Sequence, residues 1–98
     1  MYVIVQHSFK DPQTAFARGQ KLIKGADAPP GVRVLQFFPS ADGPAATCLW
    51  EAGSVEAVQG YVDSTLGDSS KNTSYEVDAD QAFAERPLGL PASLAIPA

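Results

Sequence analysis

The chain has 98 residues, of which 45% are hydrophobic and 18% are charged, and its formal net charge is −4. This length and composition are typical of one globular domain with a single core and argue against a disordered chain. The basic residues form no cluster of the kind that binds phosphate backbones, so we expect no nucleic-acid partner.

The first predicted element is a strand over residues 2–9, which opens as a nearly continuous apolar run rich in β-branched side chains. The run is interrupted at Gln6, so it is too short for a signal-peptide core or a membrane span, and we expect no membrane partner. Both alternation sets of this strand carry apolar residues, which leaves open which set faces the helices.

A helix is predicted to begin at Asp11, where an N-cap residue is followed by Pro12 at the first helical position. Apolar residues then recur at the spacing of one buried helical face. Gly25 offers a left-handed C-cap, and the proline-rich residues 28–31 forbid further helix. The buried face consists of Ala15, Phe16, Gly19, Leu22 and Ile23.

Residues 32–38 and 45–51 predict two strands, and Asp42-Gly43 between them indicates a β-hairpin turn. In the second of these strands, Cys48 and Trp50 alternate onto the same face. Cys48 is the only cysteine, so no intrachain disulfide can form, and this favours a cytoplasmic location.

A second helix is predicted between a Ser54 cap and Gly67, with apolar residues at helical spacing. After a polar stretch, residues 73–79 alternate apolar with polar side chains, as a half-exposed strand does. Residues 85–98 contain three prolines among apolar residues. They predict an irregular C-terminal arm beside a domain of residues 1–84, and we expect the first half of the arm to dock on a neighbouring surface.

The order of these elements predicts an α+β domain with the ferredoxin-like βαββαβ fold. A four-stranded antiparallel sheet would carry both helices on one face, with the first and third strands at its centre. The other face would stay open. Because the strands supply more apolar residues than one covered face needs, we expect two copies to pack through their open faces as a homodimer.

Three segments, Tyr2-Val3-Ile4-Val5, Cys48-Leu49-Trp50-Glu51-Ala52 and Gly89-Leu90-Pro91, carry a family resemblance together with the element order. In these features the chain resembles the small bacterial dimeric α/β-barrel proteins. That superfamily includes antibiotic-biosynthesis-type monooxygenases and stress-responsive barrel proteins. The resemblance implies two facing sheets that enclose a cavity, and it does not imply one chemistry.

The candidate binding residues are polar or aromatic side chains that could line such a cavity. They are His7, Gln36, Cys48, Trp50, Tyr61 and Tyr75. For each of them a purely structural role is the alternative interpretation.

His7 is the only histidine, and it could act as a general base near neutral pH. The only candidate metal ligands are His7, Cys48 and Glu51, and they lack the spacing of a metal-binding motif, so we expect no metal site. The glycines are isolated and form no phosphate-binding loop, and we expect no cofactor.

Three functions remain open at this point. The first is a non-enzymatic homodimer that binds a small apolar or aromatic molecule in the inter-sheet cavity or serves as an interaction module, and we expect this one. The second is a cofactor-independent monooxygenase or isomerase with His7 as its base. The third is a metal-binding stress protein.

Overall fold

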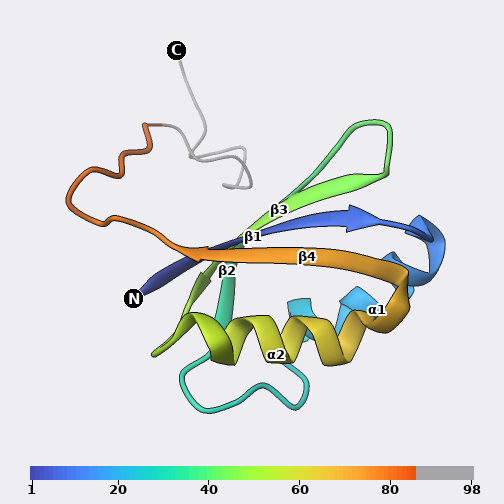
Figure 1. Ribbon diagram of the computed structural model, residues 1–98, viewed down its shortest axis with the longest axis horizontal. Coiled ribbons are helices and arrows are strands. Elements are labelled where there is room, and N and C mark those ends of the chain that lie inside the picture. The colour runs from blue at the N-terminus through green and yellow to red at the C-terminus, as the bar shows by residue number, and fades with distance from the viewer. Residues whose placement is uncertain (86–98) are drawn as a thin grey trace, which may run out of the picture.

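The computed structural model describes residues 1–85 and contains one four-stranded antiparallel sheet with two helices on one side (Figure 1). The elements in chain order are β1 (Tyr2–Phe9), α1 (Pro12–Lys24), β2 (Arg33–Pro39), β3 (Ala45–Glu51), α2 (Val55–Leu66), the 3-10 helix η1 (Gly67–Ser69) and β4 (Ser70–Glu76). The strand order is β2-β3-β1-β4, with β1 and β3 at the centre. The predicted ferredoxin-like βαββαβ fold is therefore confirmed. The predicted arm, apart from Glu85, lies outside the described residues.

Both helices begin at the caps that the sequence predicts. The Asp11 carboxylate accepts the backbone N–H of Thr14 at 3.2 Å, and the Ser54 hydroxyl accepts the backbone N–H of Ala57 at 3.1 Å. These bonds satisfy N–H groups that have no partner within the first helical turn. α1 ends at Gly25, whose φ of 71° lies in the left-handed region that favours glycine. Across residues 1–85, no helix combines the length and the apolar character needed to cross a membrane.

Two strands differ in their bounds from the prediction. β2 covers residues 33–39 instead of 32–38, and β4 covers residues 70–76 instead of 73–79. β4 is set by its antiparallel pairing with β1, in which Phe9 lies opposite Ser70 and Val3 lies opposite Glu76. A partner strand can recruit polar residues when they complete its hydrogen-bond ladder. Residues 70–72, which belong to the polar stretch before the predicted strand, are therefore part of the sheet.

The register of the sheet decides which side chains enter the core. In β1 the odd-numbered residues face the helices, and Val3 and Val5 are fully buried. In β3 Cys48 and Trp50 share one face, as their alternation predicts, and this is the face that the helices cover. These side chains pack against the apolar face of α2, which includes Val62. The side of the sheet away from the helices carries Tyr2, Ile4, Leu49 and Tyr75.

Strand β2 has a register shift between Val34 and Gln36. Gln36 consequently lies opposite Leu49 and shares the open face of the sheet, whereas Phe37 lies opposite Cys48 and shares the helix-covered face. An extra residue in one strand offsets the alternation of every residue after it. The shift therefore places an aromatic ring of the edge strand beside the core.

Candidate functional site

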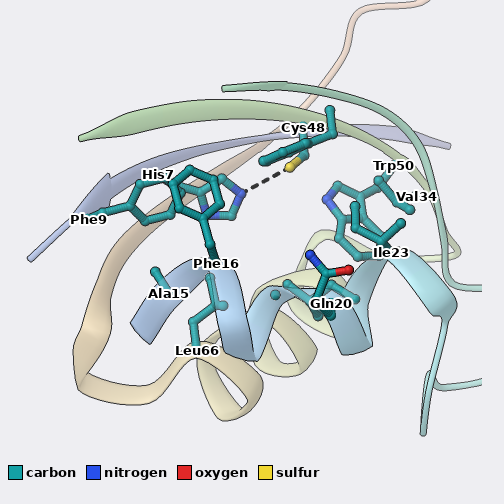
Figure 2. A pocket seen from close by; sticks show the side chains of 13 residues that line it. His7, Phe9, Ala15, Phe16, Gln20, Ile23, Val34, Cys48, Trp50 and Leu66 are labelled. Carbon is teal, nitrogen blue, oxygen red and sulfur yellow. Dashed lines mark hydrogen bonds between the residues drawn. The ribbon is translucent and has the colours of Figure 1, made fainter. Parts of the chain in front are cut away.

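A cavity of about 40 Å³ lies between α1 and the helix-covered face of the sheet (Figure 2). Its lining comes from β1, α1, β2, β3 and the end of α2. Most of the lining side chains are apolar, and the polar ones are His7, Gln20, Cys48 and the indole of Trp50. No Asp, Glu, Lys or Arg occurs among the lining residues that the structure describes. Such a mixture of apolar walls and a few polar groups is typical of small-molecule sites.

A row of aromatic rings crosses one side of this cavity. His7 stacks on Phe9 with ring centroids 5.7 Å apart, and Phe9 contacts Phe16 of α1 at 5.2 Å. Phe16 in turn meets Phe37 of β2 edge to face at 6.5 Å. Aromatic pairs in these arrangements add to the stability that burial gives. The row links β1, α1 and β2 and places partly exposed rings at the mouth of the cavity.

His7 is 5% exposed and bonds at both ring nitrogens. Its Nδ1 lies 2.7 Å from Oδ1 of Asn72, which is its direct neighbour across the β1–β4 ladder. Its Nε2 lies 3.1 Å from Sγ of Cys48. Burial lowers the pKa of His7, and this effect outweighs the Asn72 hydrogen bond and the negative charge of Asp63, which both raise it. The imidazole is therefore neutral at neutral pH.

Cys48 is buried, and burial raises the pKa of its thiol to about 12. The indole N–H of Trp50 lies near the same sulfur and opposes this rise. A thiol with such a pKa stays protonated at neutral pH, and the thiolate is the nucleophilic form of cysteine. The proximity of Cys48 to His7 therefore does not make a cysteine nucleophile.

The Nε1–H group of Trp50 makes no hydrogen bond of normal geometry among the described residues, although the Cys48 sulfur lies near it. Trp50 is 1% exposed, and its ring packs edge to face on Tyr61 with centroids 6.0 Å apart. Figure 2 shows the indole nitrogen turned toward the interior of the cavity. A buried N–H without an acceptor costs about 1–3 kcal/mol. This group is thus an unused donor on the cavity wall.

The six predicted binding residues do not share one cavity. His7, Cys48 and Trp50 line the cavity beneath α1, on the helix-covered face, and the expectation that they lie between two sheets is wrong. The cause is the sheet register, which the apolar character of both faces of β1 left undecided. Gln36 and Tyr75 lie on the open face.

Tyr61, the sixth of these residues, is buried in α2, outside the cavity lining. Its hydroxyl donates to the carbonyl oxygen of Ala26 at 2.5 Å, which holds the loop after α1 against α2. Burial raises the pKa of this hydroxyl. Its observed contacts are structural, and the role of all six residues in ligand binding stays a prediction.

Two residues that the sequence did not single out, Asn72 and Asp63, are linked to the cavity through His7. Asn72 donates from Nδ2 to Oδ1 of Asp63 at 2.9 Å and accepts at its own Oδ1 from the Ser70 hydroxyl at 2.6 Å. The sequence did not point to Asn72, because this residue lies in the polar stretch before the predicted strand of residues 73–79. The available signal was the length of β1, since an eight-residue strand needs a partner that reaches Phe9.

The three candidate metal ligands are not brought together. Glu51 alternates away from Cys48 and Trp50, and its carboxylate lies 3.9 Å from the Arg33 guanidinium at the sheet edge. Within residues 1–85, no group of three or more His, Cys, Asp or Glu side chains is arranged to hold a metal ion.

Comparisons with known proteins identify no family for this chain and one similar solved structure. Neither a family model nor a curated protein sequence matches it. Among solved structures, it is similar to "Structure of Rv0793 from Mycobacterium tuberculosis", with 16% sequence identity and a TM-score of 0.47, over 78% of this chain and 93% of the other. A likeness at this level says nothing about function.

Proposed function

We propose that this domain binds a small, neutral, mainly apolar molecule that carries a hydroxyl group, in the cavity between α1 and the sheet. The observation that carries the proposal is the unpartnered Nε1–H of Trp50 on the wall of the cavity that His7 also lines. A ligand oxygen that accepts from this N–H would recover the cost of burying it. A hydroxyl can also donate to His7, in place of the weak thiol donor of Cys48.

The size of the cavity limits how the ligand sits. A closed cavity that admits benzene measures about 150 Å³, so a space of about 40 Å³ holds only the polar end of an aromatic molecule. The apolar part would rest at the mouth, against Phe16 and Ile23 of α1 and Val34 and Phe37 of β2. Ile23 is 48% exposed there, which leaves apolar side-chain area free for such a contact.

The absence of ionised side chains from the described lining supports a neutral ligand. A charged group in this cavity would lose its hydration without gaining a counter-ion. The neutral state of His7 leads to the same conclusion, because a neutral imidazole gives an anion no charge to pair with. Phenols and alcohols fit these conditions better than carboxylates or amines.

The proposal includes a homodimer formed through the open face of the sheet, as in the dimeric α/β-barrel superfamily that the sequence resembles. On this face Tyr75, Ile4 and Leu49 form a row across β4, β1 and β3, and Tyr2 precedes Ile4 along β1. Tyr2 and Tyr75 are 42% and 50% exposed, and Ile4 and Leu49 are half-buried. An apolar row across an uncovered sheet is typical of a protein interface. The unpaired, buried thiol of Cys48 suits a reducing compartment such as the cytoplasm.

The binding proposal is tested with three matched probes on protein labelled with ¹⁵N. The probes are 4-ethylphenol, 4-ethylanisole, which accepts but does not donate, and ethylbenzene, which does neither. Trp50 is the only tryptophan, so its indole N–H gives a single NMR cross-peak. We expect 4-ethylphenol to bind most tightly and to shift this cross-peak, 4-ethylanisole to bind more weakly and ethylbenzene to leave it unchanged.

Two variants locate the site. Trp50→Phe removes the donor, and Ile23→Glu places a charge at the exposed mouth without disturbing the core. Both should weaken 4-ethylphenol binding, measured by calorimetry, whereas Tyr75→Phe on the open face should not. The proposal is abandoned if 4-ethylphenol leaves the indole cross-peak in place, as it would if only water occupied the site, or if Tyr75→Phe alone weakens binding.

One observation favours a second candidate function, a cofactor-independent oxygenase or isomerase with His7 as its base. His7 is neutral and its Nε2 faces the cavity, which are the two conditions that a general base requires. Phenols that bind would be incubated in air with wild type and with His7→Gln, and products followed by mass spectrometry. Equal turnover by the two proteins would remove this candidate.

A further inference from the structure

We infer that Asp63 and Asn72 are positioning residues that hold His7 as the Nδ1–H tautomer, so that its unprotonated Nε2 is the hydrogen-bond acceptor of the cavity. This inference deepens the proposed function, on which its relevance to ligand binding rests. The hydrogen bonds themselves involve no ligand. They run from the exposed carboxylate of Asp63 in α2 to His7 at the cavity wall.

Asp63 determines the orientation of the Asn72 amide. One carboxylate oxygen of Asp63 accepts Nδ2 of Asn72 at 2.9 Å, and the other accepts Nε2 of Gln59 at 2.9 Å. A carboxylate only accepts hydrogen bonds, so the group of Asn72 that faces it must be the NH₂ group. Gln59 also donates to the backbone oxygen of Asn72 at 2.9 Å, which ties α2 to β4 at this point.

The orientation of Asn72 then determines where His7 carries its proton. With its NH₂ group directed at Asp63, Asn72 presents Oδ1 to His7 at 2.7 Å and to the Ser70 hydroxyl at 2.6 Å. An amide oxygen accepts and cannot donate. Nδ1 of His7 must therefore carry the hydrogen, and in the neutral ring Nε2 is left with a lone pair.

The group opposite Nε2 agrees with this assignment. Cys48 stays protonated, so its S–H can donate to Nε2 across the 3.1 Å that separate them. From Cys48 through His7 and Asn72 to Asp63, every donor points the same way. Because a thiol is a weak donor, a ligand hydroxyl can replace it at Nε2. Asp63 thus influences the cavity through Asn72 and His7, although Asp63 itself does not line the cavity.

The tautomer is measured directly in ligand-free protein. His7 is the only histidine, so a long-range ¹H–¹⁵N NMR spectrum shows one imidazole and reports which nitrogen is protonated. We expect Nδ1–H in the wild type. Asn72→Leu removes the acceptor and should give the Nε2–H form. Asp63→Ala frees Asn72 to turn and should give a mixture, whereas Glu56→Ala, an exposed control on the same helix, should leave Nδ1–H.

The exchange variant D63N/N72D separates positioning from a merely structural role. It keeps the net charge, and it keeps an oxygen facing Nδ1 while the new amide at position 63 donates to the new carboxylate. We expect it to keep the Nδ1–H tautomer and to raise the pKa of His7, because the negative charge then lies next to the ring. The rise shows that the new carboxylate faces the ring, and recovery of the Nδ1–H tautomer that Asp63→Ala loses is the result that a merely structural contact does not predict.

The inference is overturned if the wild type shows Nε2–H, or if Asn72→Leu and Asp63→Ala both keep Nδ1–H. These outcomes are independent of the proposed function, because no ligand is present. In the ligand assay, Asp63→Ala should lower the preference for 4-ethylphenol over 4-ethylanisole, since only the phenol donates to Nε2. An unchanged preference would show that Asp63 has no influence on ligand binding.

Discussion

The Nε2 atom of His7 lies 3.1 Å from the Sγ atom of Cys48, although the two residues are 41 positions apart in the chain. They are diagonal neighbours on adjacent strands, since His7 pairs with Ala46 and Val5 pairs with Cys48. Diagonal side chains on one face of a sheet are close enough to touch. The β1–β3 register therefore directs both titratable side chains to the same face of the sheet, and the helices that cover this face bury them.

The thiol of Cys48 is predicted to be unreactive in the folded protein. Burial raises its pKa to about 12, so almost no thiolate exists at mildly alkaline pH. A disulfide reagent such as DTNB should label native protein far more slowly than protein in concentrated urea. Cys48→Ser supplies the background rate. Complete labelling of the native protein within the mixing time would contradict the assignment.

The buried imidazole of His7 is predicted to destabilise the fold as the pH falls. Its pKa is lowered in the folded protein from the ordinary value of 6.5. Between that lowered pKa and 6.5 the unfolded chain binds more protons at this residue, so stability rises with pH across the window and is lost as pH drops through it. The slope that one histidine contributes cannot exceed about 1.4 kcal/mol per pH unit.

Urea unfolding of the wild type and of His7→Gln, at several pH values from about 5 to about 8, isolates this effect. The variant keeps a polar side chain but cannot take up the proton. We expect the stability difference between the two proteins to change with pH through the window and to level off above it. If the free energies of unfolding of the two proteins changed with pH in parallel, His7 would have the same pKa in the folded and the unfolded protein.

Gly60→Ala is predicted to stabilise the protein by up to about 1 kcal/mol. Gly60 lies in the interior of α2, and a Cβ atom built there meets no atom within 4 Å. Alanine loses less backbone entropy than glycine on entering a helix. Gly67→Ala is the contrasting change. Gly67 has a φ of 57°, which is strained for a residue with a side chain, and a Cβ atom built there would lie 3.1 Å from the Arg18 guanidinium. Thermal unfolding should rank Gly60→Ala above and Gly67→Ala below the wild type.

Leu49→Glu is predicted to dissociate the proposed homodimer. Leu49 lies on β3 at the centre of the open face, between Ile4 and Gln36 in the cross-strand row. A carboxylate at this position would be buried without a partner on association. Gln13→Glu, an exposed change of equal charge on α1, is the control. Sedimentation should show a dimer for wild type and control and a monomer for Leu49→Glu; a wild-type monomer would refute the dimer itself.

Much of the fold follows from local signals in the sequence. Asp11 and Ser54 cap the two helices as predicted, because a cap acts on N–H groups a few residues away. β3 occupies the predicted residues, with Cys48 and Trp50 on one face. β4 is the exception, since its start depends on β1, far away in the chain. A strand that is polar in sequence shows its place only through its partner.

The sequence by itself determined which elements form, their order and the side chains with chemical potential, including His7 and Trp50. Only the tertiary structure decided where those side chains point. β1 is apolar on both faces, so periodicity could not choose between them, and the choice depended on pairing with β3 and β4. The same pairing brought Asn72 to His7 and moved the candidate site from the open face to the cavity beneath α1. Helical periodicity and capping act over a few residues, whereas the register of a sheet depends on residues that are distant in sequence.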